Sequence, residues 1–229
     1  MILKYEITNI PHEDTPNLFR IRALRDIPNS HVKAGDFGGY IQREGNLSQE
    51  GDCWISNTAW VSGNSQIYDN ARVFDNAHIF NNVYVSGNAQ VFGNAHVFEH
   101  SRVFGNAHIF GNACVFGNTK VYEDSQVFGD ARIFNNAHVY GSTLVFGNAW
   151  VYDNARIFGN ARVSSYAQVA NDVCINQNME LHSACYISSP RHIYYVDGVT
   201  AHLDKDGKLH VNGPTADIEH HKTLARLKL

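Results

Sequence analysis

The sequence predicts an all-β protein whose main part is a parallel β-solenoid, and two regularities of the chain carry this prediction. Val or Ile recurs at every sixth position from Ile55 to Ile187 without an insertion or deletion, and Leu181 is the single exception. The residue two positions earlier is small, most often Ala, and the residue before that is most often Asn. We number the six positions so that the branched residue is position one and the small residue is position five.

The geometry of a β-strand accounts for this pattern. Side chains two residues apart point to the same side of a strand, so positions five and one fill a narrow interior and positions two and six point outward. Gly, Asp or Asn at position three and Asn at position four suit a corner, because these residues tolerate left-handed backbone. A single strand cannot bury its apolar side alone, whereas stacked coils bury one continuous core.

The composition narrows the function classes. The chain has 229 residues, of which only 17% are charged, and a net charge of −4, which argues against a mainly electrostatic nucleic-acid binder. No apolar run approaches the roughly 18 residues that a transmembrane helix needs. The first residues lack a secretion-signal pattern, so we expect a cytoplasmic protein with no membrane segment. The four cysteines are widely spaced and predict no disulfide framework.

Three six-residue units make 18 residues, and this spacing resembles that of the hexapeptide-repeat left-handed β-helix superfamily. The resemblance covers Ile55 to Ile187 and implies a triangular, left-handed coil of 18 residues. At about 4.8 Å between strands, the tract would form roughly seven coils with a length of about 35 Å. The segment Val32–Ile41, followed by Gly51–Ile55, resembles the start of YdcK-like repeat proteins of bacteria, phages and prophages. Those proteins are often labelled acyltransferases on repeat similarity alone.

Three parts of the chain are expected from these patterns: an N-terminal β cap over residues 1–52, the hexapeptide-repeat β-helix over 53–195, and C-terminal strands with a capping helix over 196–229. In the N-terminal part, Lys4–Ile10 and Leu18–Leu24 are typical of β-strands. Both terminal parts would cover the open ends of the core.

The C-terminal part is expected to be a hairpin followed by a helix. Turn signals at Val196–Gly198 and Asp206–Gly207 bracket short strands. Pro214 then begins an amphipathic helix in which Ile218, Leu224 and Leu227 are the apolar positions.

Aromatic residues dominate the outward position two, and residues 18 apart should stack on one face of the solenoid. The first ladder is Phe74, Phe92, Phe110, Phe128 and Phe146; the second is Phe80, Phe98, Phe116, Phe134 and Tyr152; the third is Tyr68, Phe104, Tyr122, Tyr140 and Phe158. The rings either stiffen the sheets by covering one another or form interfaces with a protein partner, because monomers rarely expose large apolar patches.

Position six adds polar chemistry that differs between the faces. The third face carries a basic stripe of Arg102, Lys120, His138 and Arg156 beside its rings. Such a stripe could bind a nucleic-acid strand or an acidic protein surface, and nucleic acid is not favoured given the net charge. Alternatively, carboxylates at nearby corners balance the stripe: Glu99, Glu123, Asp124 and Asp153.

Few residues suggest metal binding or catalysis. The second face carries His78, His96 and Cys114 in successive coils, close enough to share a metal, although unliganded surface residues are the simpler interpretation. His100, which replaces Asn at a corner beside Glu99, is the best candidate for a general base, and a plain corner substitution is the alternative. No metal ion or cofactor is expected.

These observations favour a non-catalytic binding or scaffold protein that associates with a protein partner or with itself through its aromatic faces, as a homo-oligomer. The resemblance to phage and prophage proteins implies a chain that acts on a host protein or a host-defence complex. It also leaves an alternative, a trimeric acyltransferase that binds coenzyme A in the cleft between neighbouring subunits. Against that alternative, the repeat tract has no inserted loop to shape such a site. A self-assembling structural rod is a third possibility.

Overall fold

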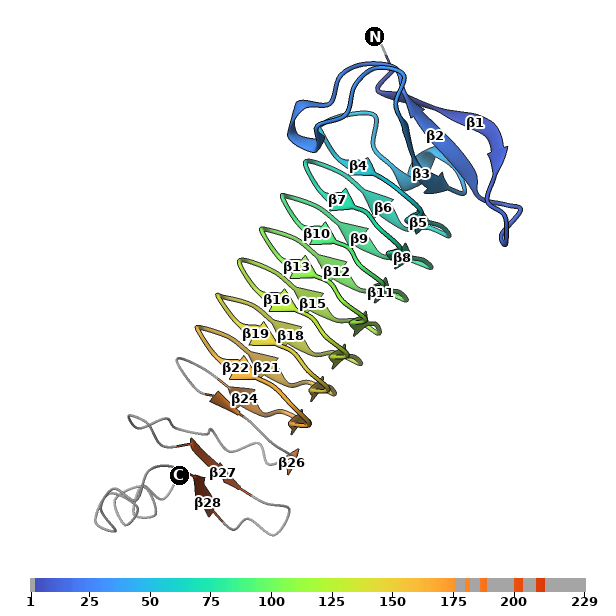
Figure 1. The fold of residues 1–229 in the computed structure, drawn as a ribbon. Coiled ribbons are helices and arrows are strands. Elements are labelled where there is room, and N and C mark those ends of the chain that lie inside the picture. Colours follow the sequence, from blue (N-terminus) through green and yellow to red (C-terminus); the bar gives the residue numbers. More distant parts are fainter. Residues whose placement is uncertain (1–2, 176–179, 182–185, 189–199, 204–208, 213–229) are drawn as a thin grey trace.

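The computed structural model describes residues 3–175, 180–181, 186–188, 200–203 and 209–212 (Figure 1). Within them, the repeat tract is a parallel β-solenoid in which each strand pairs with the strand 18 residues later; Val97, for example, is in register with Val115. The predicted fold class and coil length are therefore confirmed. The left-handed sense implied by the resemblance stays a prediction.

Three parallel sheets form the faces of the solenoid. The first face has eight strands: β4 (Trp54–Ile55), β7 (Arg72–Val73), β10 (Gln90–Val91), β13 (His108–Ile109), β16 (Gln126–Val127), β19 (Leu144–Val145), β22 (Arg162–Val163) and β25 (Glu180–Leu181). The third face has seven: β6 (Gln66–Ile67), β9 (Tyr84–Val85), β12 (Arg102–Val103), β15 (Lys120–Val121), β18 (His138–Val139), β21 (Arg156–Ile157) and β24 (Cys174–Ile175).

The second face continues directly into the N-terminal cap. Its 11-stranded sheet begins with β1 (Tyr5–Pro11), β2 (Phe19–Ala23) and β3 (Phe37–Ile41) and goes on through β5 (Trp60–Val61), β8 (His78–Ile79), β11 (His96–Val97), β14 (Cys114–Val115), β17 (Arg132–Ile133), β20 (Trp150–Val151), β23 (Gln168–Val169) and β26 (Tyr186–Ile187). The cap strands are antiparallel, and β3 pairs in parallel with β5. The cap also contains two short 3-10 turns, Pro28–Ser30 and Glu44–Asn46.

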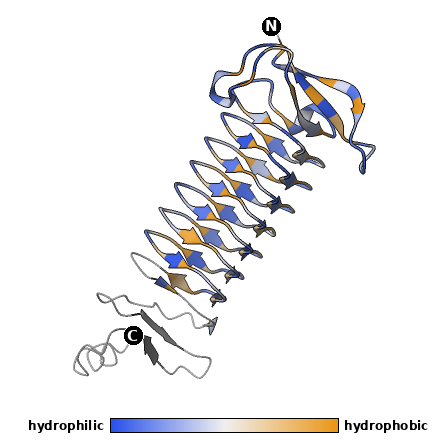
Figure 2. Cartoon of the chain, viewed as in Figure 1, coloured by the Kyte–Doolittle hydropathy of each residue, from blue (hydrophilic) through white to orange (hydrophobic). Residues whose placement is uncertain are grey.

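Each strand of the repeat tract consists of positions six and one, and the interior is filled as the period predicts. Every position-one residue from Ile55 to Ile175 is fully buried, and so is every position-five residue from Ala59 to Val173. Figure 2 shows hydrophilic and hydrophobic residues alternating along the coils. The core is thus one continuous column of branched and small side chains.

The corners lie at positions three and four, where the chain turns from one face to the next. Position three has a left-handed backbone in every coil from Asn57 to Asn171. At Gly117, with φ of +83°, an added Cβ would lie 2.5 Å from the carbonyl oxygen of Asn135 in the next coil, so only glycine fits there without a shift.

A buried lysine ties the cap to the first coil. The Lys4 amine donates hydrogen bonds to the carbonyl oxygens of Glu50 (3.1 Å) and Cys53 (3.0 Å) and lies 3.1 Å from the Cys53 Sγ. Burial lowers the pKa of Lys4 and raises the pKa of the Cys53 thiol. These hydrogen bonds join the start of the cap to the segment that leads into β4.

The C-terminal part is described only for two strands. β27 (Thr200–Leu203) and β28 (Leu209–Asn212) pair as an antiparallel ladder. The predicted turns at 196–198 and 206–207 and the predicted helix from Pro214 lie outside the described residues. Among those residues, no helix is long and apolar enough to cross a membrane.

Ala107 tests the register of the interior, because its side chain is fully buried at position five. We predict that Ala107→Leu overpacks the core and lowers the free energy of unfolding by about 1–3 kcal/mol. Gln90→Leu, at the outward position six of the preceding coil on the same face, is the control and should have little effect. Equal denaturation midpoints for the two variants would contradict this assignment of inward and outward positions.

Candidate functional site: aromatic ladders and a basic stripe

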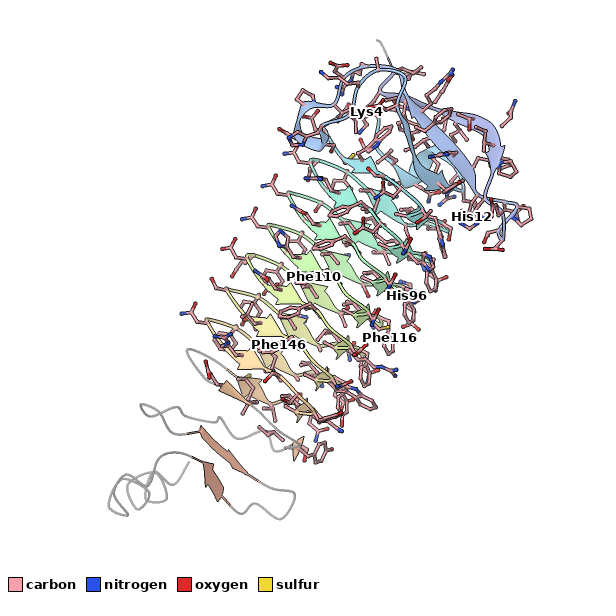
Figure 3. The ribbon with its side chains drawn as sticks, viewed as in Figure 1. Lys4, His12, His96, Phe110, Phe116 and Phe146 are labelled. Carbon is pink, nitrogen blue, oxygen red and sulfur yellow. The ribbon has the colours of Figure 1, made fainter. Side chains whose placement is uncertain are left out.

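The outward aromatic residues form stacks of nearly parallel rings. In the first ladder, consecutive ring centroids lie 4.7–5.0 Å apart with interplanar angles of 3–4°. The second ladder has spacings of 4.8–5.1 Å and angles of 1–4°. Figure 3 places Phe110 and Phe146 on one side of the rod and Phe116 on another. The spacing of the rings is that of the strands that carry them, so the backbone register sets the stack.

The third ladder is shorter than the five rings assigned to it above. Phe104, Tyr122, Tyr140 and Phe158 stack at 4.8–5.1 Å with angles of 5–7°. Tyr68 stands apart from them, because the coil between carries Ser86 at position two. Four rings, rather than five, therefore form a continuous stack on this face.

Stacking covers much of each ring. All fifteen aromatic side chains at position two are half-buried. Within each ladder, neighbouring rings cover one another's faces and leave the edges to solvent. The apolar surface of a ladder is accordingly smaller than the count of rings suggests. Mutual covering of the rings, one of the two interpretations of the sequence, is confirmed; whether the edges contact a partner stays a prediction.

Larger aromatic exposure occurs at position six of the second face. Trp150 is 37% exposed and Tyr186, two coils further, is 45% exposed. The Arg132 guanidinium lies over the Trp150 ring, 5.5 Å from its centroid, and Trp150 meets Phe134 edge-on at 6.2 Å. These contacts fix the indole in place while leaving part of it open to solvent. Both aromatic residues stand at position six, so the aromatic pattern of position two does not include them.

The two histidines of the row formed by His78, His96 and Cys114 on the second face belong to a stack of rings. His78 stacks on Trp60 at 4.4 Å, and His96 stacks on His78 at 4.8 Å. Burial, followed by the neighbouring His96 and His12, lowers the pKa of His78 to about 4, so this imidazole is neutral at pH 7. Cys114 follows in the next coil, and burial raises the pKa of its thiol. In the described part of the chain, no group of three or more His, Cys, Asp or Glu side chains could hold a metal ion.

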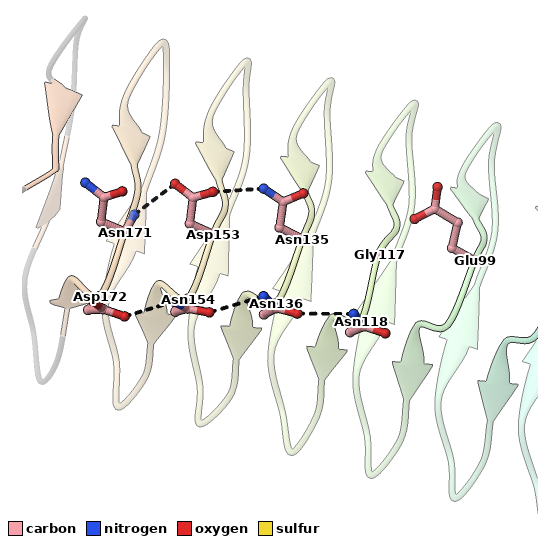
Figure 4. A pocket seen from close by; sticks show the side chains of 9 residues that line it. All are labelled: Glu99, Gly117, Asn118, Asn135, Asn136, Asp153, Asn154, Asn171 and Asp172. Atoms are coloured by element: carbon pink, nitrogen blue, oxygen red, sulfur yellow. Dashed lines mark hydrogen bonds between the residues drawn. The ribbon is translucent and has the colours of Figure 1, made fainter.

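Hydrogen-bonded amide ladders follow the corners. At the corner between the second and third faces, Asn118 donates through Nδ2 to Asn136, Asn136 to Asn154, and Asn154 to Asp172 (Figure 4). The other two corners carry ladders that end at Asp130 and Asp124. A carboxylate accepts but cannot donate, so a terminal Asp fixes the direction of each ladder.

His100 occupies one rung of such a ladder. It is exposed at position four, between Asn82 in the preceding coil and Asn118 in the following one. An open groove runs along the same corner, and Glu99, Asn118 and Asp153 are among the residues that line it. The geometry thus places His100 as an interruption of the Asn ladder, in line with a corner substitution.

The basic stripe lies in register on the third face. Arg102 pairs with Lys120, Lys120 with His138, and His138 with Arg156 in consecutive strands. None of the ion pairs found among the described residues includes a member of the stripe. Burial, and then the charges of Lys120 and Arg156, lowers the pKa of His138.

The corner carboxylates that were expected to balance the stripe bond elsewhere. Glu123 accepts a hydrogen bond from the Gly141 amide (2.8 Å), and Asp124 accepts one from the Asn106 side chain (2.8 Å). Asp153 accepts from the Asn135 side chain at 2.9 Å. These carboxylates therefore stabilise the corners, and none of them lies within 4 Å of a cation of the stripe.

Comparison with known families identifies the repeat. Residues 65–81, 125–141 and 155–171 match the family model of the YdcK beta solenoid repeat. Each matched segment begins at an inward position five: Ser65, Ser125 and Ala155. Together with the parallel solenoid, these matches show a YdcK-like β-solenoid repeat protein. A comparison with curated proteins gives no match.

The ladders predict a dependence of stability on position within the stack. Phe110 stacks on both Phe92 and Phe128, whereas Phe146 stacks on Phe128 and is followed by Ser164 at position two. We expect Phe110→Ala to lower the free energy of unfolding by about 0.5–1.5 kcal/mol more than Phe146→Ala, the value of one ring pair. Urea unfolding measures the difference. Equal losses would show that ring stacking contributes little beyond burial.

The interrupted corner ladder predicts a stabilising substitution. His100→Asn would connect Asn82 to Asn118 through two new side-chain hydrogen bonds, so we expect a higher free energy of unfolding, by up to about 1 kcal/mol for these exposed groups. His100→Ala is the control and should give no gain. A loss of stability in His100→Asn would mean that the imidazole makes a contact that the ladder cannot replace.

Proposed function

We propose that this YdcK-like repeat protein is a non-catalytic binding scaffold, a rigid three-sided rod whose aromatic faces associate with another protein. The observation that carries the proposal is the set of continuous ring stacks, in which every ring is held by its neighbours at 4.7–5.1 Å with one edge left to solvent.

The stacked rings are suited to binding because they are already fixed in position before a partner arrives. Association normally costs conformational entropy, because flexible side chains have to be fixed at the interface. Rings that are already stacked lose little freedom when a partner covers their edges. Aromatic residues are also enriched at protein interfaces, where they supply apolar area.

Of the three faces, we propose the second as the one that contacts the partner protein. Trp150 and Tyr186 are the exposed large aromatic side chains of its described repeat strands, and the Arg132 guanidinium lies over the indole. Trp, Tyr and Arg are the residue types enriched among those that dominate binding energy at interfaces.

The resemblance to phage and prophage repeat proteins suggests the class of protein to which a partner belongs. We propose a cytoplasmic protein of the host cell, such as a component of a defence complex, with self-association through the same faces as a second mode of contact. Both modes use the same apolar surface.

Crosslinking followed by reconstitution tests the proposal. A photoreactive phenylalanine analogue in place of Trp150 should capture one dominant protein in host lysate, which is then purified and titrated against the unlabelled rod. Trp150→Ser should weaken that binding at least about tenfold, equivalent to about 1.4 kcal/mol. Leu144→Ser, at the same repeat position on the first face, is the matched control and should leave the affinity unchanged.

Other outcomes would contradict the proposal. An equal loss of affinity in Trp150→Ser and Leu144→Ser, or failure of the purified partner to bind, would show that the second face does not make the contact. A discrete trimer that binds coenzyme A in calorimetry would instead favour the acyltransferase, and concentration-dependent polymers in light scattering would favour the structural rod.

A further inference from the structure

Four basic side chains share one column of the third face. Arg102, Lys120, His138 and Arg156 occupy position six of consecutive strands and are paired in register. Neighbouring members are therefore separated by one strand spacing, about 4.8 Å, and the column is about 14 Å long. Arg102 and Arg156 are exposed, so the ends of the column are open to a ligand.

The described residues leave this charge without an ion-pair partner. Three of the four carboxylates expected to balance it accept hydrogen bonds at the corners from Gly141, Asn106 and Asn135. Arg102 lies over the ring of Tyr84, 5.7 Å from its centroid, which orients the guanidinium without neutralising it. Like charges in adjacent rows of a sheet repel one another, so the stripe is a feature that the fold alone does not favour.

A column of rings runs beside the cations. Phe104, Tyr122, Tyr140 and Phe158 stand at position two of the same coils, two residues along the chain from the basic column. Residues two apart on a strand point to the same side and are separated by about 6.6 Å. The third face thus offers a cationic column and an apolar column, parallel to each other and to the axis of the rod.

We propose that the third face binds an extended acidic segment of a partner protein in which Asp or Glu alternates with apolar residues. Successive side chains of an extended chain point to opposite sides. A segment lying along the axis can therefore direct its carboxylates to the cations and its apolar side chains to the ring edges. Same-side residues repeat every 6.6–6.8 Å, so the column spans two or three carboxylates.

An acidic protein segment fits the charge better than a nucleic acid does. Three of the four members of the stripe, Arg102, Lys120 and Arg156, are charged at neutral pH, because burial and the charges of Lys120 and Arg156 lower the pKa of His138. The chain as a whole carries a net charge of −4. Polyanionic backbones gain most of their affinity from large basic surfaces, and the acidic rest of this chain would repel them. A short acidic segment needs only local complementarity.

A synthetic peptide tests the proposal on the full chain. A fluorescent peptide of about eight residues, alternating Glu and Phe, should bind in anisotropy titrations, and high salt should weaken the binding. A peptide alternating Glu and Ser tests the ring column and should bind less tightly. A peptide alternating Lys and Phe should not bind.

Two double variants with the same change in net charge localise the contact. Lys120→Gln with Arg156→Gln, and Gln90→Glu with Gln126→Glu on the first face, each make the chain more negative by two. We expect the first pair to raise the Kd at least about tenfold and the second to change it less than about twofold. Unfolding midpoints confirm that each variant is folded.

This inference rests on the proposed role as a binding scaffold, and the variants separate the two. Trp150→Ser should bind the peptide normally, so loss of the second-face contact and loss of the third-face contact are distinguishable. Equal weakening by the two double variants, or no binding by the wild type, would overturn the inference. Tighter binding of a single-stranded oligonucleotide than of the acidic peptide would assign the stripe to nucleic acid instead.

Discussion

The constraint on which the rest of this protein depends is the closure of each coil after 18 residues. Parallel pairing places every residue in register with the residue 18 positions later, one strand spacing away. Because no insertion or deletion occurs between Ile55 and Ile187, each choice of side chain is repeated as a column along the rod. One shifted residue would send an inward column to the surface, so the strict period is a requirement of the core.

Where a column repeats one type of side chain, each member interacts with the same type of side chain in the coils above and below, and this interaction is either favourable or unfavourable. Aromatic columns gain from stacking, and amide columns form hydrogen-bonded ladders at the corners that end at a carboxylate such as Asp172. In the basic column, neighbouring like charges repel, so their repetition does not stabilise the rod. This contrast distinguishes side chains that stabilise the rod from those best explained by a ligand, and it singles out the third face.

Repetition also governs how the rod begins. The cap is built on the second face, since β3 extends that sheet beyond β5, and Lys4 bonds the carbonyl groups of Glu50 and Cys53. A solenoid sheet ends in unpaired backbone groups, which promote unwanted pairing with other chains. At the N-terminal end, the antiparallel cap strands continue the second-face sheet, and the Lys4 amine bonds the Cys53 carbonyl beside β4, the terminal strand of the first face.

The sequence by itself determined the coil length, the inward positions, the three faces and the membership of each column, because all of these follow from a period of six applied to strand alternation. The period also gives the interruption at Ser86, which separates Tyr68 from its ladder. Only the tertiary structure decided how exposed the rings are, that Glu123 and Asp153 bond the corners, and that His78 stacks on Trp60. Exposure and bonding partners depend on side-chain conformations between coils and on the cap, and a one-dimensional pattern of residue types does not encode them.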